Sequence, residues 1–256
     1  TTSPGEADKA IDEIMVGRAF GTAGDKIVIQ ELLEGMEISL HALCDGKTAR
    51  LFPTAQDHKR ALDGDQGLNT GGMGTYSPAP FLDDQQLADV GRQILDPWLR
   101  GCAAEGIDFR GILYPGVMLT KNGPKVLEFN ARFGDPETQV YLTRLENELD
   151  ELLTASARGE LDRHELRWSP LASVCVVLAS AGYPASSTKG KMIYGLGEAA
   201  VLPDVKVFHA GTTTVGEDIR TNGGRVLGVT ALGTSIASAR AKAYSAVNRI
   251  HFAGMQ

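Results

Sequence analysis

Apolar residues recur at helical spacing in several stretches of the chain, and helix-capping residues mark where some of these stretches begin or end. Ser3, Pro4 and Glu6 have the spacing of a capping box, and apolar residues at positions 7, 10, 11, 14 and 15 follow them. Pro97 is expected to kink or interrupt a longer helix, and Gly159 to end another. The further predicted helices cover residues 84–106, 136–145, 148–158 and 235–250.

Other stretches have the two-residue alternation or the short apolar runs that are typical of β-strands. Lys26–Gln30 is an apolar run of the buried type, and residues 36–42 alternate, with polar side chains at 37, 39 and 41 on a solvated face. Asn122-Gly123 is a favoured hairpin turn. The remaining predicted strands cover residues 111–120 and 125–130 on either side of that turn, and then 173–179, 206–210 and 225–231.

These elements together predict an α+β fold with two parts. Short strands separated by Gly, Pro and Asn dominate after Trp168, whereas the earlier part mixes long helices with strands. We therefore predict a large α+β domain over residues 1–168 and a small β-rich domain over residues 169–256. Between residues 51 and 80 the pattern weakens into a polar, glycine-rich segment, and loops of that length are usually functional or disordered.

Composition and charge narrow the classes of function. The chain has 256 residues, 43% of them hydrophobic, and a formal net charge of −7, which argues against a general nucleic-acid binder. Cys44, Cys102 and Cys175 lack paired spacing and are expected to be buried free thiols in a reducing compartment. The sequence has no apolar run of membrane-spanning length and no signal-peptide pattern, so a cytoplasmic protein without a membrane partner is expected.

The stretch Leu127–Glu137 contains the strongest chemical signal. On a strand, Glu128, Asn130 and Arg132 share one face, and Leu127, Phe129 and Ala131 form an apolar face that can close a core. A carboxylate and an amide oxygen are hard ligands that suit Mg²⁺, and a guanidinium can meet the phosphates that accompany such a metal. The pattern therefore predicts the floor of a site that uses ATP.

Taken alone, such a row is more often the solvated side of an antiparallel sheet. The residues that follow favour a site, because Phe133–Glu137 ends the strand abruptly. Pro136 suits the first turn of a helix, with Asp135 as its cap. The glycines at 71, 72 and 74 add a second signal, since they allow close backbone approach and successive N–H groups that can cradle an anion.

Several spaced motifs resemble one family over almost the whole chain. They are Gln56–Arg60, Asn69–Gly74, Leu127–Glu137, Phe208–Thr212 and Asn222–Leu227. In this order they resemble the phosphoribosylamine–glycine ligases, also called glycinamide ribonucleotide synthetases, of the ATP-grasp superfamily. The resemblance implies an ATP-grasp module over residues 1–168, incomplete at its N-terminal side, followed by the small domain over 169–256. It also implies a missing N-terminal domain, so the chain is expected to be a piece of a longer polypeptide.

The resemblance further implies a reaction and its participants. ATP would phosphorylate glycine, and 5-phosphoribosylamine would attack the acyl phosphate to give glycinamide ribonucleotide, ADP and phosphate, a step of purine biosynthesis. The stretch Thr120–Phe129 looks like eukaryotic members, in which this enzyme is commonly one part of a multifunctional chain. Two alternatives remain open: another ATP-grasp ligase or carboxylase, and a fragment that supplies only part of the site and is inactive alone.

Site roles follow from matching this sequence to the family motifs. Glu128 and Asn130 would hold Mg²⁺ or Mn²⁺, and Arg132 and Asp135 would act in catalysis. Residues 112–119 contain no further carboxylate, so the metal would depend on phosphate oxygens and water. The expected ATP contacts are Gln30, Glu31, Leu32, Leu33 and Glu37, and the expected ribonucleotide contacts are Asp57, Lys59, Asn69, Gly71, Gly72 and Met73. The family often has Glu where Gln30 stands, but a backbone contact to adenine would survive that difference.

Overall fold

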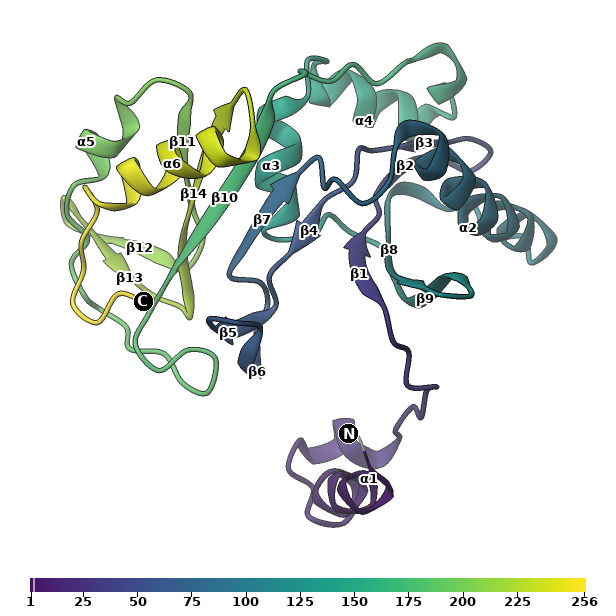
Figure 1. The fold of residues 1–256 in the computed structure, drawn as a ribbon, viewed down its shortest axis with the longest axis horizontal. Helices are drawn as coiled ribbons and strands as arrows, with labels where there is room; N and C mark the ends of the chain where they lie inside the picture. Colours follow the sequence, from purple (N-terminus) through teal and green to yellow (C-terminus); the bar gives the residue numbers. More distant parts are fainter. Residues whose placement is uncertain (2) are drawn as a thin grey trace.

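A computed structural model describes residue 1 and residues 3–256 of the chain, and its main body is built on two antiparallel sheets (Figure 1). The first sheet has the strand order β1-β8-β2-β3, with β9 paired to β8. Its strands are β1 (Met36–Ser39), β2 (Ala42–Asp45), β3 (Ala49–Leu51), β8 (Arg110–Thr120) and β9 (Gly123–Asn130). β8 is long enough to pair with β2 through its first half, and with both β1 and β9 through its second half.

The predicted hairpin is confirmed: β8 and β9 meet across Asn122 and Gly123, and Gly123 has the positive φ of 101° that the turn requires. One face of this sheet is covered by helix α2 (Asp84–Ala104), where Ile38 and Val117 pack against Val90 and Ile94. Asp83 caps α2 in a capping box with Gln86, and the helix continues through Pro97 without interruption. Burial of this apolar face stabilises the sheet on the side away from the candidate site.

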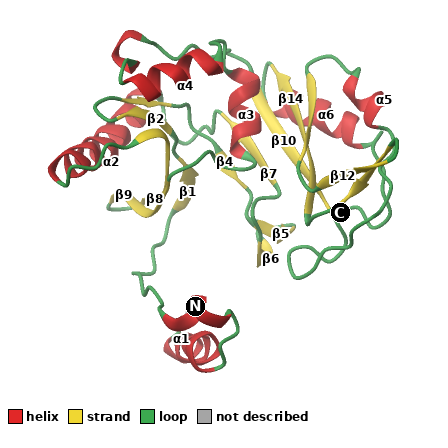
Figure 2. Cartoon of the chain, turned by 180° about the vertical axis from the view of Figure 1, so that it is seen from behind, coloured by secondary structure: helices red, strands yellow, loops and turns green. Residues whose placement is uncertain are grey.

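The second sheet has the strand order β11-β14-β10-β7-β4 and joins residues from both predicted domains (Figure 2). Its strands are β4 (Gln56–Asp57), β7 (Gly74–Ser77), β10 (Ala172–Ala179), β11 (Val205–His209) and β14 (Arg225–Gly233). β7 pairs with β10 from Gly74↔Val176 to Ser77↔Ser173. The boundary near Trp168 stays a prediction, and the sheet crosses it.

Helices fill the space around and between the sheets. α3 (Glu137–Arg144) packs against β7, β10 and β14, while α6 (Ile236–Val247) covers β10 and β14. α4 (Leu149–Arg158) packs on β2 and β8 and ends at Gly159, which is left-handed as predicted. The remaining elements are the 3₁₀ turn at Leu161–Arg163, α5 (Leu196–Ala200), and two hairpins: β5 (Arg60–Leu62) with β6 (Gln66–Asn69), and β12 (Thr212–Val215) with β13 (Asp218–Thr221).

Helix α1 and the two turns that follow it lie apart from this body, joined to β1 by an extended segment (Figure 1). α1 (Pro4–Ile11) begins as predicted, with the Ser3 hydroxyl accepting from the Glu6 N–H, and continues into a π-turn at Asp12–Val16 and a 3₁₀ turn at Gly21–Asp25. The strand predicted at Lys26–Gln30 is wrong. No strand pairs with it among the described residues, and Val28 and Ile29 are 85% and 80% exposed.

Two further expectations concern burial and membranes. Cys44 and Cys175 are buried, Cys102 is half-buried, and all three are free thiols. The polar residues of the 36–42 stretch were expected on a solvated face, but Ser39 and His41 are buried, at 4% and 0% exposure. That face is covered by the turn and helix that follow β9. Among the helices of the described residues, none is long and apolar enough to span a bilayer.

Candidate functional site

Glu128 and Asn130 lie on β9 and Arg132 lies in the bend that follows it, and the three polar side chains are connected to one another. Asn130 Nδ2 donates to Glu128 Oε1 at 3.1 Å, and Arg132 Nη2 donates to Asn130 Oδ1 at 3.3 Å. The register of β9 against β8 shifts at Leu127, which has no partner opposite it. On the opposite face of the strand, Phe129 is 48% exposed. The prediction that this face closes a core is therefore wrong for Phe129. The row thus presents a carboxylate, an amide and a guanidinium in one connected line.

A buried network lies beside this row, on the same side of the sheet. The register places Ser39 opposite Gly116 and Gly116 opposite Glu128. Ser39 Oγ donates to Glu137 Oε1 at 2.7 Å, and the Tyr114 hydroxyl donates to the same oxygen at 2.5 Å. Burial, reinforced by Glu137, raises the pKa of the Tyr114 hydroxyl, which therefore stays a donor. The network fixes the start of α3 on the sheet.

His41 holds the turn that follows Arg132. Its Nε2 accepts the Gly134 N–H at 3.0 Å, and its ring stacks on Tyr114 with centroids 4.0 Å apart. Burial, together with the nearby Arg132 charge, lowers the pKa of His41 to about 3. The imidazole is therefore neutral and carries its proton on Nδ1, which has no hydrogen-bond partner among the described residues. His41 is an acceptor that positions the turn.

Residues predicted for ATP and for the ribonucleotide meet at the end of β1. Lys59 forms an ion pair with Glu37, and Gln56 Nε2 donates to the Glu37 carbonyl at 3.2 Å. Burial alone would lower the pKa of Lys59, but the hydrogen bond and charge of Glu37 outweigh burial and raise that pKa. Burial, with the charge of Glu137, raises the pKa of Asp57 to about 8, although Lys59 and Arg225 oppose the shift. Asp57 Oδ1 is buried and has no partner among the described residues.

The glycine-rich segment packs against Asp57, but it does not form the predicted anion cradle. Gly72 has a φ of 111°, and a Cβ added there would lie 2.6 Å from Asp57 Oδ1. The successive N–H groups donate within the chain: Gly71 to the Tyr183 hydroxyl, Gly72 to Thr70 Oγ1, and Met73 to the His58 carbonyl. The cradle prediction is therefore wrong, because these donors are already satisfied. The glycines instead allow a close approach of backbone to Asp57.

Asp135 is bound on both carboxylate oxygens. Oδ1 accepts from Gln139 Nε2 at 2.9 Å, and Oδ2 accepts from Arg225 Nη2 at 3.1 Å. The predicted helix-capping role of Asp135 is wrong, since Pro136 precedes the first helical residue and no side chain caps it. The carboxylate is directed to side chains instead of the N–H groups of α3.

The other predicted site residues, Gln30–Leu33 and Asn69, lie on two separate segments. Gln30 Nε2 donates to the Leu127 carbonyl at 3.0 Å, which sets the extended segment beside β9. Glu31, Leu32 and Leu33 follow in that segment, and Leu32 is exposed. Asn69 pairs with Arg60 in the exposed β5–β6 hairpin, and no hydrogen bond or ion pair of the described residues joins it to the others.

The row fits a divalent cation that is bound mainly by phosphate. Glu128 and Asn130 supply two neighbouring oxygen donors, and the structure leaves Glu128 exposed and Asn130 half-buried. Within the described part of the chain, no group of three or more His, Cys, Asp or Glu could hold a metal. Mg²⁺ usually takes one or two carboxylates and completes its shell with substrate phosphates and water. The residues therefore fit an ion that arrives with a nucleotide.

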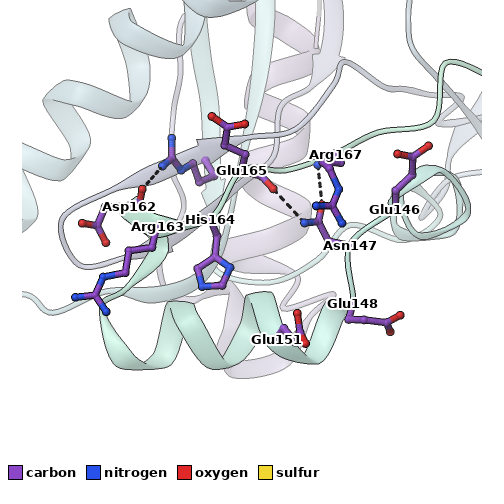
Figure 3. A pocket seen from close by; sticks show the side chains of 10 residues that line it. Glu146, Asn147, Glu148, Glu151, Asp162, Arg163, His164, Glu165 and Arg167 are labelled. Atoms are coloured by element: carbon purple, nitrogen blue, oxygen red, sulfur yellow. Dashed lines mark hydrogen bonds between the residues drawn. The ribbon is translucent and has the colours of Figure 1, made fainter.

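A surface cavity of 580 Å³ lies elsewhere, between α4 and the segment after it (Figure 3). Charged side chains such as Glu146, Glu148, Arg163 and Glu165 line it. Arg50 and Asn147 donate to the Asp162 and Glu165 carbonyls, so the polar groups at its wall bind the chain itself. The cavity shares no lining residue with the predicted site.

Sequence reasoning missed five residues of the site: His41, Tyr114, Glu137, Tyr183 and Arg225. Glu137 is the last residue of the Leu127–Glu137 motif. Its place at the start of a predicted helix, close to Asp135, could have indicated a role in the site. Arg225 belongs to the Asn222–Leu227 motif, which resembles the family but was given no site role. Tyr183 had no local signal, because its partner Gly71 is 112 residues away.

Comparison with known families matches both parts of the chain. The phosphoribosylglycinamide synthetase ATP-grasp (A) domain matches residues 1–138, and the C domain of the same synthetase matches residues 173–256. A phosphoribosylamine–glycine ligase of Vigna unguiculata is 49% identical over 254 residues, covering 97% of this chain and 81% of that protein. The Vibrio cholerae ligase is 48% identical over 98% of this chain, which spans 58% of its length.

Solved structures show the same relationship. The crystal structure of phosphoribosylamine–glycine ligase from Thermotoga maritima has a TM-score of 0.79 and 35% identity, covering 89% of this chain and 56% of that one. The biotin carboxylase domain of 2-oxoglutarate carboxylase from Hydrogenobacter thermophilus, solved with MgADP and bicarbonate, has a TM-score of 0.61 and 16% identity, covering 86% of this chain and 46% of that one. The second likeness concerns the fold alone.

Proposed function

The chain belongs to the phosphoribosylglycinamide synthetase family, and from this premise we propose that it carries part of the active site of a phosphoribosylamine–glycine ligase. The enzyme would join glycine to 5-phosphoribosylamine with ATP, giving glycinamide ribonucleotide, ADP and phosphate, in purine biosynthesis. The single observation that carries the proposal is the connected row of Glu128, Asn130 and Arg132. A site of this composition suits phosphate chemistry, because a carboxylate, an amide oxygen and a guanidinium can hold a divalent cation and the phosphates that accompany it.

The reaction has two balanced steps. A glycine carboxylate oxygen attacks the γ-phosphorus of ATP, the bond to the β–γ bridging oxygen breaks, and ADP leaves. The amine nitrogen of 5-phosphoribosylamine then attacks the acyl carbon, the bond from that carbon to the phosphate oxygen breaks, and the amine loses a proton. Both steps need positioning and stabilisation of charge on phosphoryl oxygens.

The residues of this chain divide these tasks. Glu128 and Asn130 would hold Mg²⁺ or Mn²⁺, which when bound would neutralise charge on the ATP phosphates. Arg132 would stabilise charge on the transferring phosphoryl group, and His41 would keep its turn in place through Gly134. The segment Gln30–Leu33 would meet adenine, and Glu37 the ribose hydroxyls. The Glu37–Lys59 ion pair joins that side of the site to the next.

The ribonucleotide side would be formed by Asp57, Lys59, Gly71, Gly72 and Met73, with Asn69 at its rim. Lys59 would bind an anionic group of the substrate, and Asp57 lies behind it against Gly72. Asp135 would act in catalysis by its place on the turn after Arg132. Its carboxylate is held by Gln139 and Arg225, which supports a role in keeping the turn in register.

Other features of the parent ligase are proposals of the same kind. The chain spans 58% of the length of the Vibrio cholerae relative, so the remaining parts, an N-terminal domain among them, would complete the ATP site. We place the enzyme in the cytoplasm, where ATP and small-molecule substrates are available, and propose glycine, 5-phosphoribosylamine and ATP as its partners. A multifunctional parent chain stays a prediction from the stretch Thr120–Phe129.

The proposal is tested by replacing Glu128 with Ala in the complete polypeptide that carries this sequence. ADP release in the presence of glycine and 5-phosphoribosylamine is expected to fall by about 100-fold or more, because a metal ligand is lost. Lys125→Ala is the matched control, since Lys125 is exposed on the same strand and lies outside the row. Full activity in Glu128→Ala would refute the metal assignment. Turnover by residues 1–256 alone would rule out the inactive-fragment alternative.

A further inference from the structure

Gly71 is held by two side chains from the C-terminal part of the chain. Its N–H donates to the Tyr183 hydroxyl at 2.8 Å, and its carbonyl accepts from Arg225 Nη1. Both polar backbone groups of one loop residue are thus bound by side chains that are 112 and 154 positions away in the sequence. Because the N–H and the carbonyl of Gly71 belong to different peptide units, these two contacts fix the peptide planes on both sides of its Cα.

Arg225 also binds the turn that follows the polar row. Nη1 donates to the Asp135 carbonyl at 2.5 Å, and Nη2 donates to the Asp135 carboxylate at 3.1 Å. The side chain is 22% exposed, so these bonds are partly shielded from water. One guanidinium therefore connects the glycine-rich segment to the turn that starts at Arg132, using the planar fork of donors that lysine lacks.

The surroundings hold both side chains in place. A Cβ added to Gly224 would lie 2.3 Å from the Tyr183 ring, so the ring rests directly on the backbone beside Arg225. Ser180 Oγ donates to the Gly223 carbonyl at 2.8 Å, and Gln256 Nε2 donates to the Tyr183 carbonyl at 2.8 Å. The C-terminal fold therefore positions Tyr183 and the backbone that carries Arg225.

We propose that Tyr183 and Arg225 are positioning residues for the ribonucleotide side of the site. They fix Gly71, and through it Gly72, against Asp57, and they keep that segment in register with the Asp135 turn. The C-terminal part of the chain thereby sets the backbone of a substrate site whose residues belong to the earlier part. This inference rests on the proposed function, because it assigns that site to 5-phosphoribosylamine.

The first test separates the Michaelis constants of the three substrates. In Arg225→Lys of the complete polypeptide, KM for 5-phosphoribosylamine is expected to rise about tenfold or more, since hydrogen bonds from a charged group are lost. Tyr183→Phe is expected to raise it about fivefold, for one neutral hydrogen bond. KM for ATP and the unfolding midpoint should stay near wild type in both. The controls are Arg220→Lys and Tyr244→Phe, because Arg220 pairs with Asp218 within the β12–β13 hairpin and Tyr244 is exposed on α6.

The second test does not depend on activity. Amide hydrogen exchange of a peptide that contains Gly71–Met73 should be about fivefold faster in Tyr183→Phe, because the Gly71 N–H loses its acceptor, and unchanged in both controls. Unchanged exchange in Tyr183→Phe, or an equal rise in all three KM values with a lower unfolding midpoint, would overturn the inference. If the wild-type protein fails to ligate glycine, the proposed function fails, while the exchange rates still decide whether the two side chains fix the loop.

Discussion

At the scale of single residues, the carboxylate of Asp57 is held in an unfavourable environment. Its Oδ1 is buried without a partner among the described residues, and Glu137 adds a second negative charge nearby. Burial and that charge raise the pKa of Asp57 to about 8, so the folded protein holds a proton there that the unfolded chain releases near pH 4. Strongly shifted groups of this kind are typical of functional sites.

Replacing Asp57 with Asn is therefore expected to stabilise the fold in a pH-dependent way. With the folded-state pKa raised, the stability that wild-type Asp57 contributes is fully present below about pH 4 and is lost as the pH rises through about 8. The amide mimics the protonated acid at every pH. The variant should thus match wild type near pH 4 and exceed its free energy of unfolding by about 1 kcal/mol or more at pH 8.5.

Urea unfolding at the two pH values measures this difference. Asp63→Asn is the control, because Asp63 is exposed at the tip of the β5–β6 hairpin. A variant that is less stable than wild type at pH 8.5 would contradict the raised pKa. The same variant is expected to bind 5-phosphoribosylamine more weakly, so stability and activity should change in opposite directions.

The row at the end of β9 could be predicted because alternation places Glu128 and Asn130 on one face of the strand, and Arg132 follows directly after it. Burial of the neighbouring polar residues could not. Ser39 and His41 read as solvated in the alternating pattern, but Glu137 and the Gly134 N–H come from a later turn to bind them. A polar side chain is buried when its partner arrives from elsewhere, and a local pattern contains no information about that partner.

At the scale of elements, helices with local signals were predicted well. α2 starts at the expected Asp84, and α4 ends at the expected Gly159. The strand at Lys26–Gln30 was wrong because strand formation depends on a neighbouring strand, whereas a helix satisfies its own backbone. The segment 51–80, expected as a loop, contains the short strands β4 to β7, which pair with one another or with the second sheet.

The cap of α2 gives a prediction at this scale. The Asp83 side chain accepts the Gln86 N–H at 2.8 Å, and the Gln86 side chain accepts the Asp83 N–H at 2.9 Å. Asp83→Ala is expected to lower the free energy of unfolding by about 1 kcal/mol without changing KM for any substrate, because α2 packs on the sheet face away from the site. Gln85→Ala, at an exposed position of the first turn, should leave stability within about 0.5 kcal/mol. An equal loss in both variants would contradict the capping role.

At the scale of the whole molecule, the second sheet unites the two predicted domains. Its order β11-β14-β10-β7-β4 combines strands from residues 56–77 with strands from residues 172–233. The sequence could not predict this pairing, since strands about 100 residues apart leave no local trace of each other. Cys175 also belongs to the same core cluster as Leu43 and Tyr141, so hydrophobic packing crosses the junction as well.

This junction predicts how the chain behaves when it is cut. A protease site inserted between Arg163 and His164, at the end of the 3₁₀ turn in which Asp162 and Arg163 are exposed, would divide the chain before β10. The two pieces are expected to co-elute in size-exclusion chromatography and to unfold in one transition. The β7–β10 ladder, the packing of α3 on β10, and the buried Arg144 hold them together.

A substitution at Arg144 tests which contacts hold the two pieces of the cleaved protein together. Its guanidinium donates to the Leu171 carbonyl at 2.8 Å, to Ser77 Oγ at 2.7 Å and to the Ser169 carbonyl at 3.2 Å, and so binds both sides of the junction. Arg144→Met removes these three hydrogen bonds and should weaken association of the pieces by about 2 kcal/mol or more, because each bond comes from a charged donor. Arg158→Met, at an exposed position, should not weaken it. If the two pieces of the cleaved wild-type protein elute separately in native buffer, the sheet does not unite the molecule. The boundary near Trp168 would then divide two independent domains.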